Sequence, residues 1–145
     1  MPFVSTNYAT NPKAPAGTWV CAPTSAIPPS GSVPTTNTNH PDYCGQCVSY
    51  VKQVCPTLPA KVGDWTKGAS VRRHPSIVAG TVIATFDSNG AYSGHAAIYV
   101  SQTADAINVY DQYQTPPNPK AIGPRPLRFN GSGVNDGDNY FVVEG

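Results

Sequence analysis

A cysteine, a histidine and an aspartate stand in an order that can build a nucleophilic site. Cys47 opens a short apolar run, His95 begins a second one, and Asp111 ends a third. A thiolate beside an imidazole can attack a carbonyl carbon, and a carboxylate on the other ring nitrogen fixes the tautomer and orientation of the imidazole. We therefore expect Cys47 to be the nucleophile, His95 the general base and acid, and Asp111 the group that orients His95.

The residues just before Cys47 are suited to stabilise an oxyanion. Gly45 and Gln46 allow a sharp backbone turn and leave amide donors free at the start of a predicted helix. The backbone N–H of Cys47 and a neighbouring polar group, with Tyr43 as the favoured second donor, would face the oxygen that gains charge. The helix N-terminus and a nearby imidazolium also stabilise a thiolate, whose ordinary pKa is about 8.5.

Apolar spacing predicts that one short helix carries Cys47. Apolar side chains at positions 47, 48, 50, 51 and 54 form a stripe at helical spacing. The step from Cys55 to Pro56 is the expected end, because proline disfavours a helical residue before it. The helix is about three turns long at most, with Cys47 in its first turn.

Strand-like runs follow the helix. The D-S-N-G segment is a turn signal that predicts a hairpin, and a second polar turn, T-A-D, separates the runs that carry His95 and Asp111. One helix followed by several antiparallel strands indicates an α+β fold. The expected strands cover residues 80–86, 95–101, 106–113 and 139–144, with a short one at 126–129.

The composition fits one domain and excludes several partners. The chain has 145 residues, of which 39% are apolar and only 12% are charged, and its formal net charge is +1. Such a chain can bury one core but offers no basic stripe for phosphates. No run approaches the length of a membrane span, and no cleavable signal is visible at the N-terminus. We expect a monomer with no nucleic-acid partner and no membrane span.

The C-x-x-C formed by Cys44 and Cys47 has two further interpretations. Zinc requires three or four ligands, and the sequence contains neither a second C-x-x-C nor an H-x-x-x-H. A thioredoxin-type redox pair would follow a βαβ pattern, which does not precede it. We therefore expect no metal and no cofactor. His40 and His74 lack a comparable context and are interpreted as solvated loop residues.

Three segments in combination resemble the NlpC-type cell-wall peptidases and the related CHAP amidases. G-Q-C-V-S-Y-V resembles their nucleophile helix, G-H-A-A-I-Y-V their histidine strand, and V-Y-D-Q-Y the strand with the third catalytic residue. Other segments, such as D-W-T-K-G-A-S-V, look especially like a small, largely bacterial group of single-domain members. The resemblance covers residues 43–144. It implies a papain-like core with the nucleophile helix on a four- to six-stranded antiparallel sheet, and a cysteine hydrolase acting on amide bonds of peptidoglycan without a cofactor.

The resemblance leaves some roles open. CHAP enzymes often carry Glu at the position of Asp111 and Asn two positions later, where this chain has Tyr113. Gln112 and Tyr113 therefore stay candidates for the oxyanion or substrate site, and Gln112 for the third catalytic role. Trp65 and Tyr92 are candidates to line a substrate groove by stacking on sugar or packing on peptide, although a tryptophan in a small domain more often belongs to the core.

The N-terminal part of the chain differs in composition. Pro, Thr, Ser, Ala and Asn dominate residues 11–43, which favours extended and turn conformations. We expect residues 1–42 to form an arm or insert that acts as a lid or a substrate-selecting element. Residues 43–145 are then the catalytic domain.

A disulfide is expected to involve Cys21. Cys44 and Cys55 flank the helix and would lie ~16 Å apart, whereas a disulfide spans at most about 7 Å between Cα atoms. Cys21 can pair with Cys44 or with Cys55, and we favour Cys44. Such a bond fits an oxidising compartment. We therefore expect an exported or secreted protein that acts in the periplasm or cell wall.

Several functions are compatible with the same residues. Hydrolysis of peptidoglycan, in the stem peptide or at the muramoyl–alanine bond, is the favoured one. The alternatives are a papain-like acyltransferase or deamidase acting on a protein or lipid, and a catalytically silent wall-binding module on the same fold. For an antibacterial effector, an immunity or inhibitor protein is a candidate partner.

Overall fold

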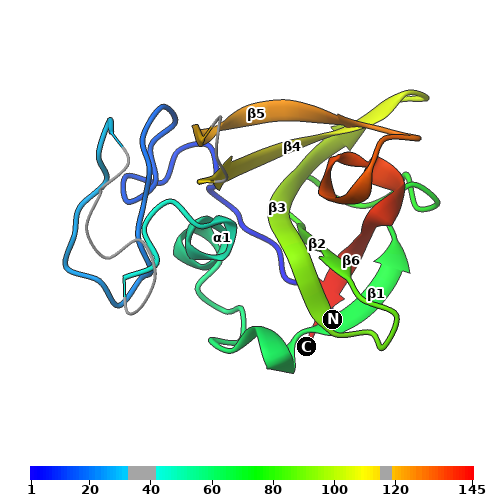
Figure 1. The fold of residues 1–145 in the computed structure, drawn as a ribbon, viewed down its shortest axis with the longest axis horizontal. Helices are drawn as coiled ribbons and strands as arrows, with labels where there is room; N and C mark the ends of the chain where they lie inside the picture. Colours follow the sequence, from blue (N-terminus) through cyan, green and yellow to red (C-terminus); the bar gives the residue numbers. More distant parts are fainter. Residues whose placement is uncertain (33–41, 115–118) are drawn as a thin grey trace.

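The computed structural model describes residues 1–32, 42–114 and 119–145. These residues form one α-helix and a single antiparallel sheet whose six strands are arranged in the order β1-β6-β2-β3-β4-β5 (Figure 1). The expected α+β class is confirmed. The elements are α1 (Cys47–Val54), β1 (Thr66–Ser70), β2 (Val82–Phe86), β3 (Tyr92–Gln102), β4 (Ala106–Tyr113), β5 (Lys120–Arg128) and β6 (Tyr140–Glu144), with short 3-10 helices at Val62–Asp64, Gly133–Asn135 and Gly137–Asn139.

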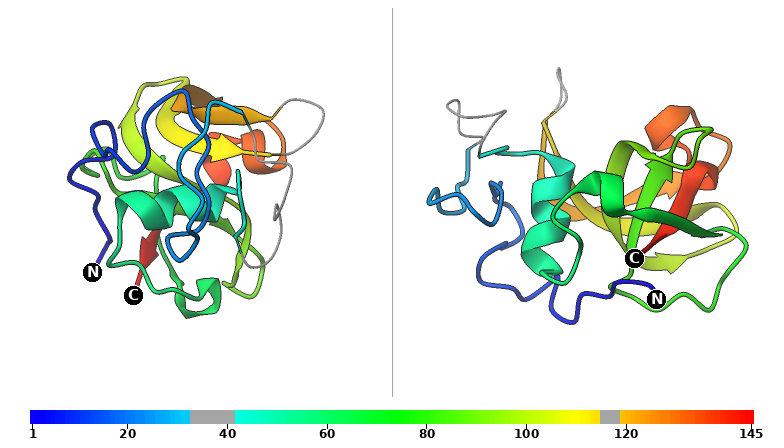
Figure 2. Two further views of the ribbon diagram at one scale, coloured as in Figure 1. Left: turned by 90° about the vertical axis from the view of Figure 1, so that its left-hand side faces the viewer. Right: turned by 90° about the horizontal axis from the view of Figure 1, so that it is seen from below.

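The helix α1 has the limits that its sequence predicts. It begins at Cys47 and ends at Val54, directly before the Cys55–Pro56 step. Its apolar stripe is buried at Tyr50, Val51 and Val54, and the helix packs across β3 and β4 (Figures 1 and 2). Packing of this stripe stabilises a helix of eight residues that would be marginal on its own.

Both faces of the central sheet are buried, which explains why every residue of β2 except Thr85 is apolar. Val82 and Ala84 belong to the core cluster beneath α1, whereas Ile83 belongs to a second cluster with Tyr99 and Leu127. Successive side chains of a strand point to opposite faces, so a strand buried on both faces has no polar alternation. The strands that carry the candidate site therefore lie in a sheet that is covered on both faces.

The register of β3 and β4 brings His95 and Asp111 together. Ile98 pairs with Tyr110 in this antiparallel ladder, so Asp111 lies opposite Ala97. His95 is two residues before Ala97 and shares its face of the sheet. The two candidate residues are therefore diagonal neighbours on adjacent strands, within reach of long side chains.

Two strands differ from the sequence expectation. The short strand expected at 126–129 is the end of β5, which begins at Lys120. Pro124 and Pro126 disfavour a strand prediction, because proline cannot donate to a ladder. However, β5 is an edge strand, where a missing N–H is tolerated. Strand β1 was not expected, because T-K-G-A-S is polar and contains glycine; it pairs with β6 at the opposite edge.

The described part of the N-terminal segment has extended and turn conformations, as expected. Its only ladder contacts are single bridges, such as Val4 to Thr81 and Trp19 to Ser30. Ala14 and Val20 are nevertheless buried in the core beneath α1, so part of this segment contributes to the main core. Within the described ranges of the chain, no helix is both long and apolar enough to cross a membrane.

Candidate active site

Cys47 is the first residue of α1 and opens onto a cleft. Tyr43 and Gly45 have φ angles of 49° and 78°, and this turn brings the extended Gln46 to the N-cap position. The Cys47 thiol is half-buried, and its Sγ lies 3.5 Å from the hydroxyl oxygen of Tyr92. Tyr43, Gln46, Cys47 and Tyr92 all line a cleft of about 550 Å³.

His95 and Asp111 are joined by a short hydrogen bond. Nε2 of His95 lies 2.7 Å from Oδ2 of Asp111, and both side chains are buried. The backbone N–H of His95 donates to Oγ1 of Thr85 on β2 at 3.0 Å. Gly94 has a φ of 108°, and a Cβ there would lie 2.5 Å from the same Thr85 oxygen. Glycine is therefore required beside His95 on conformational and steric grounds.

Two basic side chains surround Asp111, and sequence analysis missed both. Arg125 donates from Nε to Oδ2 of Asp111 at 2.9 Å, and its Nη2 is also 2.9 Å from that oxygen. Lys120 donates to the carbonyls of Asp111, Ala121 and Gly123, and its Nζ lies 3.2 Å from Oδ1 of Asp111. The only local signal was three basic residues in the proline-containing run 120–128, whose pattern does not predict a strand.

The three central groups shift one another's pKa. Burial opposes ionisation of the Cys47 thiol, but the hydrogen bond and charge of His95 outweigh it and lower the pKa of Cys47. Burial alone would lower the pKa of His95, but hydrogen bonds to Asp111 and Cys47 raise it to about 9. Burial likewise disfavours the Asp111 carboxylate, yet His95 and Arg125 hold its pKa below the usual value. These directions favour a thiolate–imidazolium pair over a neutral thiol and imidazole.

Tyr92 also stabilises the Cys47 thiolate. Burial, together with the neighbouring Cys47, raises the pKa of the Tyr92 hydroxyl, which therefore keeps its proton. A protonated hydroxyl 3.5 Å from Sγ can donate to the thiolate. The ring of Trp65 meets the ring of Tyr92 edge to face at 5.1 Å between centroids.

Trp65 does not line the cleft, contrary to one interpretation of the sequence. It is only 3% exposed and belongs to the main core, and its Nε1 donates to the Pro59 carbonyl at 3.1 Å. Tyr113 lies beside His95, with ring centroids 6.1 Å apart, and the Arg125 guanidinium carbon is 4.9 Å from the Tyr113 ring. Trp65 thus supports Tyr92, whereas Tyr113 packs directly on the candidate site.

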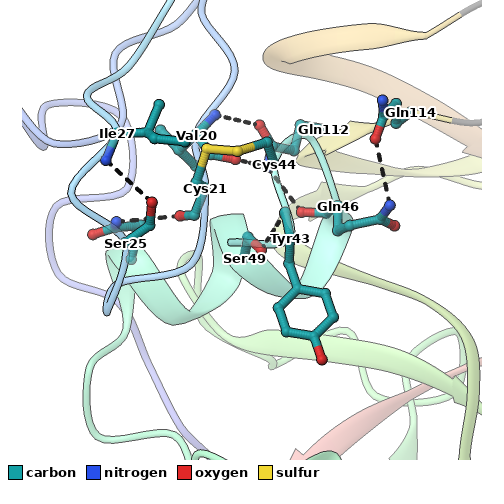
Figure 3. Close-up of a disulfide and its surroundings, with 11 residues drawn as sticks. Val20, Cys21, Ser25, Ile27, Tyr43, Cys44, Gln46, Ser49, Gln112 and Gln114 are labelled. Atoms are coloured by element: carbon teal, nitrogen blue, oxygen red, sulfur yellow. Dashed lines mark hydrogen bonds between the residues drawn. A yellow bond between two sulfur atoms is a disulfide. The ribbon is translucent and has the colours of Figure 1, made fainter. Parts of the chain in front are cut away.

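The position of Gln112 argues against its predicted role at the oxyanion or as a third catalytic residue. Its side chain is fully buried, accepts from the Val20 N–H at 2.9 Å, and donates to the Val20 carbonyl at 3.0 Å. It also donates to the Gln46 carbonyl at 2.8 Å (Figure 3). Both functional ends of this amide are therefore engaged in holding the N-terminal segment against the start of α1.

The disulfide joins Cys21 to Cys44, the pair that we favoured (Figure 3). Cys47 and Cys55 are the free cysteines. Because Cys44 is bonded, the C-x-x-C cannot supply two thiolates to zinc. In the part of the chain that the structure describes, no group of three or more His, Cys, Asp or Glu residues is arranged to hold a metal.

The remaining histidines lie apart from the site. His74 is exposed, and its Nδ1 is 3.0 Å from the carbonyl oxygen of Ser70. The prediction that His74 is a solvated loop residue fits this position. His40 lies outside the described residues.

Comparison with known proteins identifies the family. A family model described as Domesticated amidase effector 2 matches residues 8–143. A protein of Ixodes scapularis with this name is 38% identical over 104 residues, which cover 68% of this chain and 70% of the relative. The Type VI secretion amidase effector 2 protein of Salmonella typhi is 32% identical over 115 residues, covering 68% of this chain and 84% of the relative.

A solved structure is also similar to this chain. The structure of type 6 secretion amidase effector 2 matches with a TM-score of 0.59 and 31% identity, and the match covers 68% of this chain and 80% of that chain. With the family model spanning nearly the whole chain, the protein belongs to the Domesticated amidase effector 2 family.

Proposed function

We propose that the protein is a cysteine amidase that hydrolyses amide bonds of peptidoglycan, in the stem peptide or at the muramoyl–alanine bond. The observation that carries the proposal is the arrangement of Cys47, His95 and Asp111. The thiol lies at a helix N-terminus and lines the cleft, and it interacts with a buried imidazole that a carboxylate holds at 2.7 Å. Membership of an amidase effector family supports amide hydrolysis.

The first step is attack by the Cys47 thiolate on the amide carbonyl carbon. The carbonyl oxygen gains negative charge, which the Cys47 backbone N–H stabilises together with Tyr43 or Gln46. Because Nε2 of His95 is bonded to Asp111, Nδ1 is the ring nitrogen left for the reaction. Its proton passes to the leaving amine as the C–N bond breaks, and a thioester on Cys47 remains.

The second step is hydrolysis of this thioester. Neutral His95 removes a proton from water through Nδ1, and the resulting hydroxide attacks the thioester carbonyl. The C–S bond breaks, the carboxylic acid product leaves, and Cys47 returns as a thiolate beside the imidazolium. Asp111 keeps its charge throughout and stabilises the imidazolium.

We further propose a papain-like core of the NlpC and CHAP type and a two-part organisation of the chain. A nucleophile on the first turn of a helix, packed against strands that carry His95 and Asp111, supports this core. Residues 43–145 are the catalytic domain. Residues 1–42 are an arm that bears on substrate access, since Ala22 of this arm lines the same cleft as Cys47.

The proposed site of action is the cell wall of a bacterium, reached by export. One relative is named as a type VI secretion effector, and the disulfide between Cys21 and Cys44 fits an oxidising compartment. An immunity or inhibitor protein that covers the cleft is the proposed protein partner.

Digestion of purified peptidoglycan tests the hydrolase. The wild-type protein is expected to release fragments whose masses show addition of water across one amide bond. Cys47→Ala should release none, whereas Cys55→Ser, which alters the other free cysteine, should retain activity. Intact peptidoglycan after treatment with wild type would contradict the proposed function. Unchanged cleavage by Cys47→Ala would contradict the assigned nucleophile.

A further inference from the structure

The cleft at Cys47 continues along the helix. Val48 and Lys52 are four residues apart and therefore lie on one face of α1. Both line the cleft, together with Ala60 and Val62 of the segment after the helix. Cys47 opens the helix and Lys52 is in its last turn, so the cleft runs from the thiol to the lysine over a mostly apolar floor.

Among the described residues that line the cleft, Lys52 is the single lysine, arginine, aspartate or glutamate. Its Nζ donates a short hydrogen bond to the carbonyl of Ala60, a neutral acceptor. All eight Asp and Glu residues of the chain lie within the described ranges, and the ion pairs there leave Lys52 without an acidic partner. An ammonium has three donors, so Lys52 can still bind an anion.

Partial burial raises the cost of this unpaired charge. Removal from water lowers the pKa of Lys52, and no acidic neighbour offsets the effect. An incoming carboxylate would supply the missing counter-charge in a place where water is partly excluded, and such bonds are stronger than those between neutral groups. The surroundings of Lys52 therefore favour an anionic ligand.

The spacing indicates where the anion lies on the substrate. Lys52 is five positions after Cys47 in the helix, a rise of ~7.5 Å along the axis. An extended peptide advances about 3.3–3.6 Å per residue, so this rise corresponds to roughly two residues. We propose that Lys52 binds a free carboxylate of the stem peptide about two residues from the amide that Cys47 attacks. This inference rests on the proposed function and names a specificity-determining residue for it.

The alternative is that Lys52 has a purely structural role, and a test must distinguish this role from carboxylate binding. A lysine in the last turn of a helix interacts favourably with the helix dipole, and the bond to Ala60 fixes the following segment. Loss of these contacts would weaken binding of every ligand equally. A carboxylate site instead distinguishes ligands that differ only in that group.

Two matched stem peptides provide the test, one with free side carboxylates and one with the same groups as carboxamides. Binding is measured by calorimetry on the Cys47→Ala protein, in which no turnover occurs. We expect the carboxylate peptide to bind about tenfold more tightly or better, in line with a hydrogen bond to a charged group. Adding Lys52→Gln should remove this preference, and adding Lys52→Arg should retain it.

Lys13→Gln on the same background is the matched control, because Lys13 is exposed and does not line the cleft. It should leave the preference unchanged. Equal affinity for the two peptides, including no measurable binding of either, would overturn the carboxylate site. So would a preference that survives Lys52→Gln. Carboxylate-selective binding without hydrolysis by wild type would instead overturn the proposed function and leave the site standing.

Discussion

At the scale of single residues, Asp111 is surrounded by more positive charge than the orientation of His95 requires. Its Oδ2 accepts from Nε2 of His95 and from Nε of Arg125, while Lys120 approaches Oδ1. Opposite charges within a few ångströms keep a carboxylate ionised. The positive charge of Arg125 simultaneously disfavours a second positive charge on His95. Arg125 therefore holds Asp111 ionised, and we expect its charge also to limit how far the His95 pKa rises.

The pH profile of peptidoglycan cleavage should report the opposing effects of Asp111 and Arg125 on the pKa of His95. The thiolate–imidazolium pair exists above the lowered pKa of Cys47 and below that of His95, about 9. Activity should therefore fall as the pH drops through the first value and as it rises through the second. Asp111→Asn removes the negative charge, so we expect the alkaline limb at lower pH and a rate reduced by about 10⁴. Arg125→Gln should move that limb to higher pH.

The measurement is kcat/KM as a function of pH. Arg72→Gln is the matched control, since Arg72 pairs with Asp138 away from the site and should leave both limbs in place. Shifts of the alkaline limb in the same direction for Asp111→Asn and Arg125→Gln would show that Asp111 and Arg125 do not act on His95 through charge.

At the scale of elements, the site depends on bonds between segments far apart in the sequence. Thr85 on β2 fixes the backbone of His95 on β3, and Gln112 on β4 fixes both Val20 and Gln46. The second set connects the N-terminal segment, the start of α1 and the sheet through one side chain. The position of Cys47 is thus set by tertiary contacts as well as by the helix itself.

Replacement of Gln112 by leucine should destabilise the protein strongly. The change keeps the volume similar but leaves the buried Val20 N–H without a partner. The Val20 and Gln46 carbonyls each lose one bond and still accept from the backbone N–H groups of Gly45 and Ser49. An unpaired buried N–H costs about 1–3 kcal/mol and each lost hydrogen bond about 0.5–1.5 kcal/mol, so we expect a loss of about 2 kcal/mol or more in the free energy of unfolding. Urea denaturation measures it.

Gln114→Leu provides the comparison. Gln114 makes one long bond, 3.4 Å, to the Gln46 side chain, so its replacement should change stability by less than about 1 kcal/mol. If Gln112→Leu were no more destabilising than Gln114→Leu, the connecting role of Gln112 would be wrong.

At the scale of the whole molecule, the disulfide ties the N-terminal segment to the nucleophile helix. Cys21 and Cys44 are 23 residues apart, and the bond lies three residues before Cys47 (47 − 44). Gly45 also donates to the Val20 carbonyl at 3.0 Å, beside the bond. The covalent link and these hydrogen bonds act on the same turn, so the arm and the proposed catalytic domain should unfold together.

Removal of the disulfide should lower stability by about 3 kcal/mol, the loop-entropy value for a closed loop of this length. The measurement is denaturant unfolding of wild type with and without dithiothreitol, and of the Cys21→Ser, Cys44→Ser double variant. Cys55→Ser controls for loss of a thiol outside the bond. The wild-type protein starts with the disulfide formed. If dithiothreitol left its unfolding midpoint unchanged, a stabilising role of the disulfide would be contradicted.

Much of the fold and the candidate site could be predicted because the signals are local. The apolar spacing around Cys47 and the Pro56 stop give the helix its observed limits, and alternation and β-branching locate β2, β4 and the end strand β6. The cysteine, histidine and aspartate each occupy one such element at a recognisable place. Local periodicity and residue chemistry are sufficient for these features.

The tertiary structure decided what depends on pairing between distant segments. Strand β1 and most of β5 exist because a neighbouring strand supplies partners for a polar or proline-rich edge, which no local pattern reveals. The same is true of Arg125 on Asp111 and of the burial of Gln112. The sequence by itself identified the candidate reactive groups, because their chemistry follows from residue type and local spacing. The packing of sheet, helix and arm determined which charged and polar groups surround them, and it placed Lys52 in the same cleft.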